Sequence, residues 1–420
     1  MMQINKDFQR IWWARLISIL GTGLTGFGLS VWVFSCTGKA TPMAITMLCS
    51  ILPSILLAPF SGVLCDKFNR KKIIILADSL AALISILIWI YLNIGDFSFG
   101  IVCLFVLSSS AANTFDNNAY QASISTLVAK EELKKANGLN QLIDSLSNIA
   151  SPILAGILYA FVGLKGIIVI DLLSYCVSML LFLKVDREKF TNPKLLKKNR
   201  EGKVAVWEGL KFIASQKSLM VLLIYFTLLN FLFNISVTLI EPFTLTIGNS
   251  MDLGFIKASG GIGLLCGSLY VSFYKFKWNP SAVICFGVFS AGAALMLMGA
   301  SELIFLIALG RLLFCCSVPV TNTIAGTLWL AKTPQELQGR VFASRVMIAK
   351  CFMPFSYLLV GPLVDRVLPI LLKSEAGRFL KYVLGGKSME YRLVFLGVGV
   401  IIMLITLAIA FNKSFRELDN

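Results

Sequence analysis

The chain has 420 residues, of which 57% are hydrophobic and 14% are charged, and its formal net charge is +16 at pH 7. So apolar a composition excludes an ordinary water-soluble domain. The basic residues gather in short loops between apolar runs, so the positive charge indicates membrane topology and not nucleic-acid binding.

Apolar runs of membrane-spanning length follow one another along almost the whole chain. A run of roughly 20 residues matches the ~30 Å hydrocarbon core of a bilayer. In lipid the backbone groups must be satisfied within each segment, which favours helices. The sequence therefore predicts an all-α membrane protein with twelve transmembrane helices, near 11–35, 43–64, 73–94, 99–119, 139–162, 166–184, 218–246, 255–274, 281–300, 302–326, 343–368 and 392–411.

Most of the 38 Lys and Arg residues fall in alternate loops. The positive-inside rule then predicts a multi-pass protein of the cell membrane with both termini in the cytoplasm. The longest connection, 185–217, is predicted to be a cytoplasmic linker between two six-helix bundles, 1–184 and 218–420. Its basic residues alternate with apolar ones such as Trp207 and Phe212, which suggests an amphipathic helix; a solvated linker is the alternative.

The two halves share a weak internal repeat. The stretches 127–138 and 330–340 both contain an A-K…E-L core. Parallel repeats of this kind occur in transporters whose two bundles rock around a central site. The chain has no His, and its ten Cys include no C-x-x-C, so we predict no metal, no bound cofactor and no disulfide framework.

The most specific motif is G-V-L-C-D-K-F-N-R-K-K at 62–72, between the second and third runs. Gly62 permits close helix approach, and Asp66 can pair with Arg70 or face the N-terminus of a neighbouring helix. These three residues are predicted to form a conformational latch. The alternative is a positively charged inner loop that contains Asp66 by chance.

This loop resembles the signature loop of the major facilitator superfamily. Further stretches, at 77–78, 131–137, 170–174, 339–342 and 361–366, resemble the macrolide-efflux-like drug exporters, so that the likeness covers essentially the whole chain. The resemblance implies a twelve-helix secondary transporter, not an enzyme, that works as a monomer and is driven by proton exchange. It also implies that Gly339 and Arg340 lie near the latch.

The sequence departs from this family pattern in two places. Ser109 stands about where many proton-coupled exporters have an arginine in the fourth span. The fifth span reads S-P-I-L-A-G at 151–156 where antiporters tend to have a fuller glycine–proline motif. Pro152 and Gly156 still predict a kinked fifth span.

Ionisable residues inside the spans are functional candidates, because burying a charge in hydrocarbon costs about 3 kcal/mol or more. Asp171 and Glu241 are the leading candidates for a carboxylate that binds protons or substrate. The further candidates are Asp116, Asp144 and Arg311. For the others a structural role is favoured: Asp78 would pair with the basic loop, whereas Arg15, Lys350 and Asp365 lie near span ends and can reach the interface.

Small residues in the spans predict close helix contacts at Gly21, Gly26, Gly263 and Gly267. Gly21, Gly23 and Gly26 also fit G-x-G-x-x-G, but they lie inside an apolar run with no preceding strand. A dinucleotide site needs a strand, a turn and a helix in that order. The sequence therefore predicts packing, not nucleotide binding, at this position.

Together these patterns predict an alternating-access transporter that exports amphipathic or hydrophobic small molecules; the resemblance implies macrolide-like drugs as substrates and exchange for protons. Its partners would be the substrate, protons and membrane lipid. The alternatives are an importer, or an exporter of an endogenous product such as a siderophore or a peptide-like metabolite. A membrane-embedded enzyme or sensor would require clustered catalytic residues or an added soluble domain.

The predicted topology can be tested by labelling single cysteines in a cysteine-free background. Residues near 68, 132, 200 and 335 should react from the cytoplasmic side, and residues near 96 and 380 from outside, because basic residues are retained inside. Labelling of position 200 from outside would contradict this arrangement.

Overall fold

A computed structural model describes residues 6–57, 60–61, 64–65, 68–128, 132–185, 202–274, 278–334, 337–375, 385–386 and 388–419. Within these ranges the chain forms helices and turns but no strand. The predicted all-α class is therefore confirmed.

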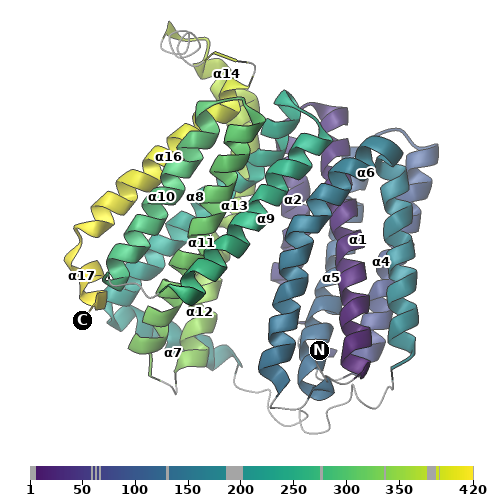
Figure 1. Ribbon diagram of the computed structural model, residues 1–420, viewed down its shortest axis with the longest axis horizontal. Coiled ribbons are helices and arrows are strands. Elements are labelled where there is room, and N and C mark those ends of the chain that lie inside the picture. Colours follow the sequence, from purple (N-terminus) through teal and green to yellow (C-terminus); the bar gives the residue numbers. More distant parts are fainter. Residues whose placement is uncertain are drawn as a thin grey trace. The chain divides into compact units, whose positions relative to one another are not determined.

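The helices follow the apolar runs in chain order (Figure 1). The first group is α1 (Lys6–Thr37), α2 (Ala40–Leu56), α4 (Arg70–Ile94), α5 (Phe99–Leu127) and α6 (Leu133–Leu183). The second group is α7 (Gly202–Ser215), α8 (Lys217–Ile247), α9 (Ser250–Phe273), α10 (Pro280–Ala300) and α11 (Ile304–Lys332). The last group is α12 (Gln338–Cys351), α13 (Met353–Pro362), a π-helix (Leu363–Val367), α14 (Leu368–Leu371), α16 (Met389–Ala410), α17 (Lys413–Arg416) and a 3₁₀ turn (Glu417–Asp419).

The predicted number of twelve spanning helices is not confirmed exactly. Among the described residues, ten helices are long and apolar enough to cross a membrane. One difference is α2, which has only 17 residues in its described helical range. The other is α6, whose 51 residues cover the predicted fifth and sixth runs. The helix is broken at Gly163, which lies between the predicted runs 139–162 and 166–184, so the two runs remain separate helical segments inside this one element.

The break inside α6 lies at Gly163, where φ is 62° and ψ is −171°. A residue with a side chain rarely adopts that φ, whereas glycine does so readily. The helix continues through Pro152 and Gly156. A kink at those two residues stays a prediction.

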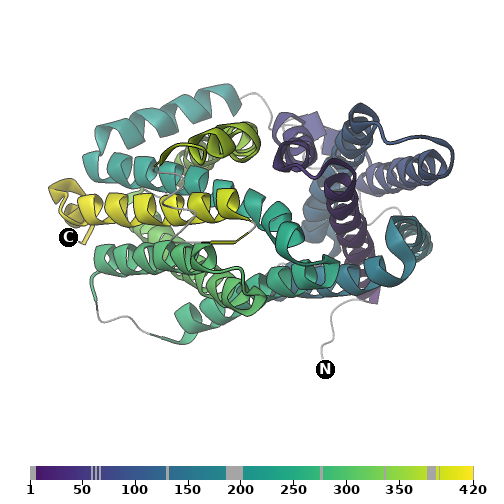
Figure 2. The same cartoon turned by 90° about the horizontal axis from the view of Figure 1, so that it is seen from above.

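The chain forms two compact units (Figures 1 and 2). Unit 1 comprises Met1–Gly38 and Ile45–Lys198, and unit 2 comprises Lys39–Ala44 and Asn199–Asn420. In unit 1, α1 packs along α6, and α4 packs against α5 and α6. In unit 2, α9 packs against α11, α10 lies between α11 and α16, and α8 contacts α13.

The amphipathic helix predicted in the connection is present as α7, and the alternative of a purely solvated linker is wrong for Gly202–Ser215. This helix packs against α12 and α8 of unit 2. The preceding part of the connection, 186–201, lies outside the described residues.

Glycines bring α9 and α11 together. A Cβ atom on Gly263 would collide with the backbone carbonyl of Leu312, and one on Gly267 with that of Cys316. The predicted close contacts are confirmed for these two glycines. Gly26 differs, because no atom lies within 4 Å of a Cβ built there.

This difference yields a matched pair of substitutions. Gly267→Ala should lower the free energy of unfolding by about 1–3 kcal/mol, because the new methyl group overpacks against a backbone that cannot move away. Gly26→Ala should leave it unchanged or raise it by up to about 1 kcal/mol, because alanine favours the helix. Melting temperatures of the purified proteins in detergent measure both effects. Equal destabilisation by the two substitutions would contradict the α9–α11 packing described above.

Candidate functional site

An ion pair lies between α1 and α5 in unit 1. Arg15 donates to the carboxylate of Asp116, and the two side chains are only 11% and 6% exposed. Arg15 also donates to Asn117 at 3.0 Å, and its guanidinium lies 5.0 Å from the ring centre of Tyr120. Arg15 therefore does not extend to the interface, as its place near a span end had suggested, because α5 offers it an anion within the unit.

Asp78 on α4 belongs to the same group. It is buried and close enough to both Asp116 and Arg15 to interact with them electrostatically. The expected pairing of Asp78 with the basic loop stays a prediction, because Lys67 of that loop lies outside the described residues. Arg70 of the loop donates to the carbonyl of Ala122 at 2.6 Å. A second buried carboxylate thus lies near the Arg15–Asp116 ion pair.

Asp171 lies on α6 in different surroundings. It is 2% exposed, and it accepts a hydrogen bond from the hydroxyl of Thr25 on α1 at 2.7 Å. The hydroxyl of Ser174 is 3.4 Å from the carboxylate and donates at 2.7 Å to the carbonyl of Asp171. The ion pairs of the described residues do not include Asp171. Its carboxylate is therefore held by neutral hydroxyl groups.

The close approach of α1 to α6 depends on Gly21. A Cβ atom there would collide with Ser174 and with the carboxylate of Asp171. The predicted close contact at Gly21 is confirmed, and its consequence is that α1 seals Asp171 inside unit 1.

Tyr175 connects the two groups of charges. It is buried, and its hydroxyl shares a 3.0 Å hydrogen bond with Thr22 of α1. It is close enough to Asp171, Asp78 and Asp116 to interact with each electrostatically. We call Arg15, Asp78, Asp116, Asp171 and Tyr175 the unit 1 polar network.

A second carboxylate lies in unit 2. Glu241 on α8 is 4% exposed, and one of its oxygens accepts a hydrogen bond from Lys257 on α9. The other oxygen, Oε2, is buried and has no hydrogen-bond partner among the residues described. Lys257 thus balances the charge of Glu241, and, within the described ranges, the Oε2 atom of Glu241 remains free to accept a hydrogen bond.

Arg311 on α11 lies near this pair. Gly260, one helical turn beyond Lys257 on α9, lies directly against the Arg311 side chain. The guanidinium is 5.7 Å from the ring centre of Phe314, and its Nε is buried with no hydrogen-bond partner in the described part of the chain. Unit 2 therefore gathers one carboxylate and two cations on three neighbouring helices.

The remaining predicted site residues are only partly described. Gly62 and Asp66 lie outside the described residues. Gly339 and Arg340 lie in the first turn of α12, and Asp144 lies in α6, but the side chains of these three residues are outside the description.

Sequence reasoning missed Lys257, Thr25 and Tyr175. Lys257 could have been found, because the connection between α8 and α9 is only two residues long and keeps it near Glu241 along the bilayer normal. Thr25 and Tyr175 gave no signal of their own, because hydroxyl residues are common in membrane helices.

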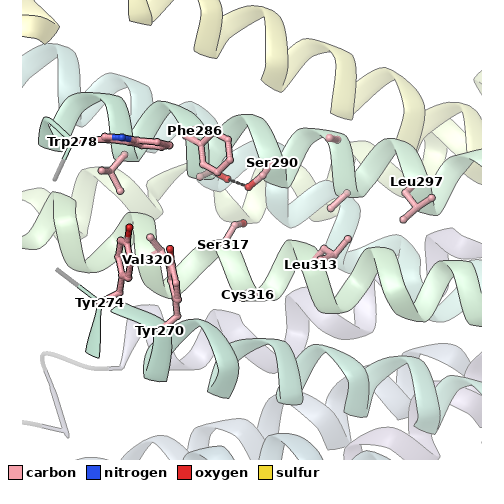
Figure 3. A pocket seen from close by; sticks show the side chains of 14 residues that line it. Tyr270, Tyr274, Trp278, Phe286, Ser290, Leu297, Leu313, Cys316, Ser317 and Val320 are labelled. Carbon is pink, nitrogen blue, oxygen red and sulfur yellow. Dashed lines mark hydrogen bonds between the residues drawn. The ribbon is translucent and has the colours of Figure 1, made fainter. Parts of the chain in front are cut away.

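Unit 2 also has an apolar cavity of about 610 Å³ between α9, α10 and α11 (Figure 3). Tyr270, Tyr274, Trp278 and Phe286 line one part of it, and Leu297 and Leu313 line another. The four aromatic side chains are about half exposed or more, so the cavity is a groove at the surface of the unit. Its size and lining suit a hydrocarbon group, of lipid or of an apolar ligand.

Comparison with known proteins is consistent with these features. The sequence profile of the Major Facilitator Superfamily matches residues 11–357. Macrolide efflux protein A of Streptococcus pyogenes is 26% identical over 375 residues, which cover 86% of this chain and 90% of that protein. The multidrug efflux pump Tap of Mycolicibacterium fortuitum is 23% identical over 397 residues, which cover 88% and 94%.

Solved structures agree on the fold. A bacterial homologue of the human lysosomal transporter Spinster, inward-facing and unoccupied, superposes with a TM-score of 0.71 at 11% identity, covering 99% of both chains. A bacterial homologue of the iron transporter ferroportin, inward-facing, has a TM-score of 0.70 at 14% identity and covers 97% of this chain and 99% of its own.

The Arg15–Asp116 pair can be tested by a double-mutant cycle. Arg15→Met should lower the free energy of unfolding by about 3–5 kcal/mol, because it leaves buried carboxylates without their cation. Arg15→Met combined with Asp116→Leu should recover much of that loss, since the second change removes the orphaned charge. Additive losses in thermal unfolding would show that the two residues do not act as a pair.

Proposed function

The chain belongs to the Major Facilitator Superfamily, and from that premise we propose that it exports amphipathic or hydrophobic small molecules, including macrolide-like drugs, in exchange for protons. The names of the macrolide and multidrug efflux relatives support the substrate class, and they match over most of the chain. Such a transporter works by alternating access of a site between two bundles.

The observation that carries the proposal is the setting of Asp171. Asp116 and Glu241 each have a fixed cationic partner, Arg15 and Lys257 respectively. Asp171 is held by hydroxyl groups, which can both donate and accept a hydrogen bond. They can therefore satisfy Asp171 with or without its proton. Asp171 is the proton carrier in this proposal.

The remaining residues of the unit 1 polar network would connect Asp171 to the Arg15–Asp116 pair. The hydroxyls of Tyr175 and Thr22 already share a hydrogen bond and can pass a proton in either direction. The Arg15–Asp116 pair joins α1 to α5, so a change in the charge of the network would alter the contact between these two helices.

The charges of unit 2 favour a second candidate substrate. Arg311 has a buried Nε without a described partner, and Lys257 lies one turn from the glycine that contacts it. Two cations beside a single carboxylate suit a substrate that carries a carboxylate of its own. An endogenous peptide-like product with an acidic group is therefore the alternative to a macrolide-like drug.

Further parts of the proposal concern organisation. We propose the bundles 1–184 and 218–420 joined by a cytoplasmic linker at 185–217, in the bacterial plasma membrane, with both termini in the cytoplasm. The protein would act as a monomer. Its latch would comprise Gly62, Asp66 and Arg70, with Gly339 and Arg340 nearby. The multi-pass helices and the bacterial relatives support the membrane location.

The coupling role can be tested in inverted membrane vesicles incubated with a panel of macrolides, in which export appears as uptake into the vesicle. Asp171→Asn should reduce uptake driven by a proton gradient about tenfold or more, while equilibrium exchange of substrate continues, because asparagine keeps the hydrogen bonds but cannot release a proton. Glu241→Gln tests the second carboxylate in the same way.

Asp252→Asn is the matched control, because Asp252 is a carboxylate that only caps the start of α9. It should pump as the unchanged protein does. If both Asp171→Asn and Glu241→Gln pump normally against a gradient, proton exchange at these two residues is excluded.

A further inference from the structure

The start of α2 is held by a carboxylate from a distant part of the chain. Asp365 accepts hydrogen bonds from the backbone N–H groups of Ala40 at 3.0 Å and of Thr41 at 2.7 Å. It also accepts one from the hydroxyl of Thr41 at 2.5 Å. The N-terminal N–H groups of a helix have no partner within the helix, and a carboxylate there is further stabilised by the helix dipole. We call this contact the Asp365 clamp.

Two features of the backbone near Asp365, a π turn and a glycine, bring this residue close to α2. The residue lies in the π-helix Leu363–Val367, directly after Pro362. Proline lacks an N–H group, so the helical bonding pattern must adjust there. Single π turns are frequent at functional sites. One turn earlier, Gly361 lies against Thr41, and a Cβ atom on Gly361 would collide with it. Both the turn and the glycine thus bring Asp365 within reach of α2.

The residues at the start of α2 belong to a different unit from the rest of the helix. Lys39–Ala44, its first turn included, groups with unit 2, whereas the helix from Ile45 onward groups with unit 1. Ala40, Met43 and Ala44 are buried, as are Val360 and Val364. The first turn of a helix that otherwise belongs to unit 1 is therefore packed and hydrogen-bonded within unit 2.

The sequence repeats the clamp motif. The stretch 361–366 reads G-P-L-V-D-R, and the stretch 62–67 reads G-V-L-C-D-K. Both follow G-x-L-x-D and then a basic residue, and both lie at the C-terminal end of a predicted span. The predicted topology places the first at the inner end of the second span and the other at the outer end of the eleventh.

We propose that Asp365 is a positioning residue for transport: it forms an outer latch that holds the start of α2 in one state of the transport cycle and releases it in the other. The inference rests on the proposed alternating-access function. Asp66 would form the matching inner latch, so that each carboxylate stabilises the state in which the other contact is open. A few kcal/mol of difference between the two latches suffices to shift such an equilibrium.

Hydrogen–deuterium exchange of the purified full chain in lipid nanodiscs tests the latch without any substrate. Asp365→Asn and Gly361→Ala should each make the backbone amides of 40–47 exchange about tenfold faster. Asp365→Asn removes the charge that holds the start of α2, and Gly361→Ala removes the space that Thr41 occupies. Asp66→Asn should make the same amides exchange more slowly, since it weakens the opposing latch. Asp365→Asn combined with Asp66→Asn should return the rate towards that of the unchanged protein.

A return of the exchange rate in the double variant distinguishes a latch from a simple helix cap, because a cap that stabilises only one helix end would not respond to Asp66→Asn. Asp252→Asn is the matched control: it should speed exchange only at the start of α9, and Asp66→Asn should not reverse that change. If Asp66→Asn fails to reverse the effects of both Asp365→Asn and Gly361→Ala, the clamp is a local cap and the proposal is wrong. A failure of drug transport with normal recovery here would overturn the proposed substrate class but not the latch.

Discussion

Hydrocarbon offers a charged group neither water nor counter-ions, so each ionisable residue within a span must be satisfied by the protein itself. Arg15 with Asp116, Lys257 with Glu241, and the hydroxyl-bound Asp171 are three responses to this constraint. Arg392 shows a fourth, because it is buried and donates to the carbonyls of Gly299, Ala300 and Gly385. Each response fixes one helix against another, and together they set how the helices pack.

The positions of the helices could be predicted because hydropathy and length determine which segments cross a bilayer. The predicted runs 218–246 and 281–300 agree within a residue or so with α8 and α10. The division of α6 was predictable too, because the break at Gly163 lies in the short gap between the predicted runs 139–162 and 166–184. The positive φ of Gly163 was not predictable, because no hydropathy pattern records a backbone angle.

The candidate site was predictable only in part, for a different physical reason. Asp171, Glu241 and Arg311 are conspicuous as single charges in apolar runs. Their partners come from other helices, and the sequence does not reveal how each helix is rotated about its axis. Arg15 and Asp365 show the limit most clearly, because their places near span ends suggested contact with the interface, whereas the structure gives both of them partners inside the protein.

The glycine contacts between α9 and α11 bear on how this protein can evolve. Gly263 and Gly267 bring two backbones so close that no larger residue fits between them. A substitution at this α9–α11 contact, the seam formed by Gly263 and Gly267, therefore changes helix packing more directly than it changes recognition of a substrate. Variants with a new substrate range should therefore accumulate on the other faces of these helices, and the seam should remain nearly invariant among descendants that differ in what they carry.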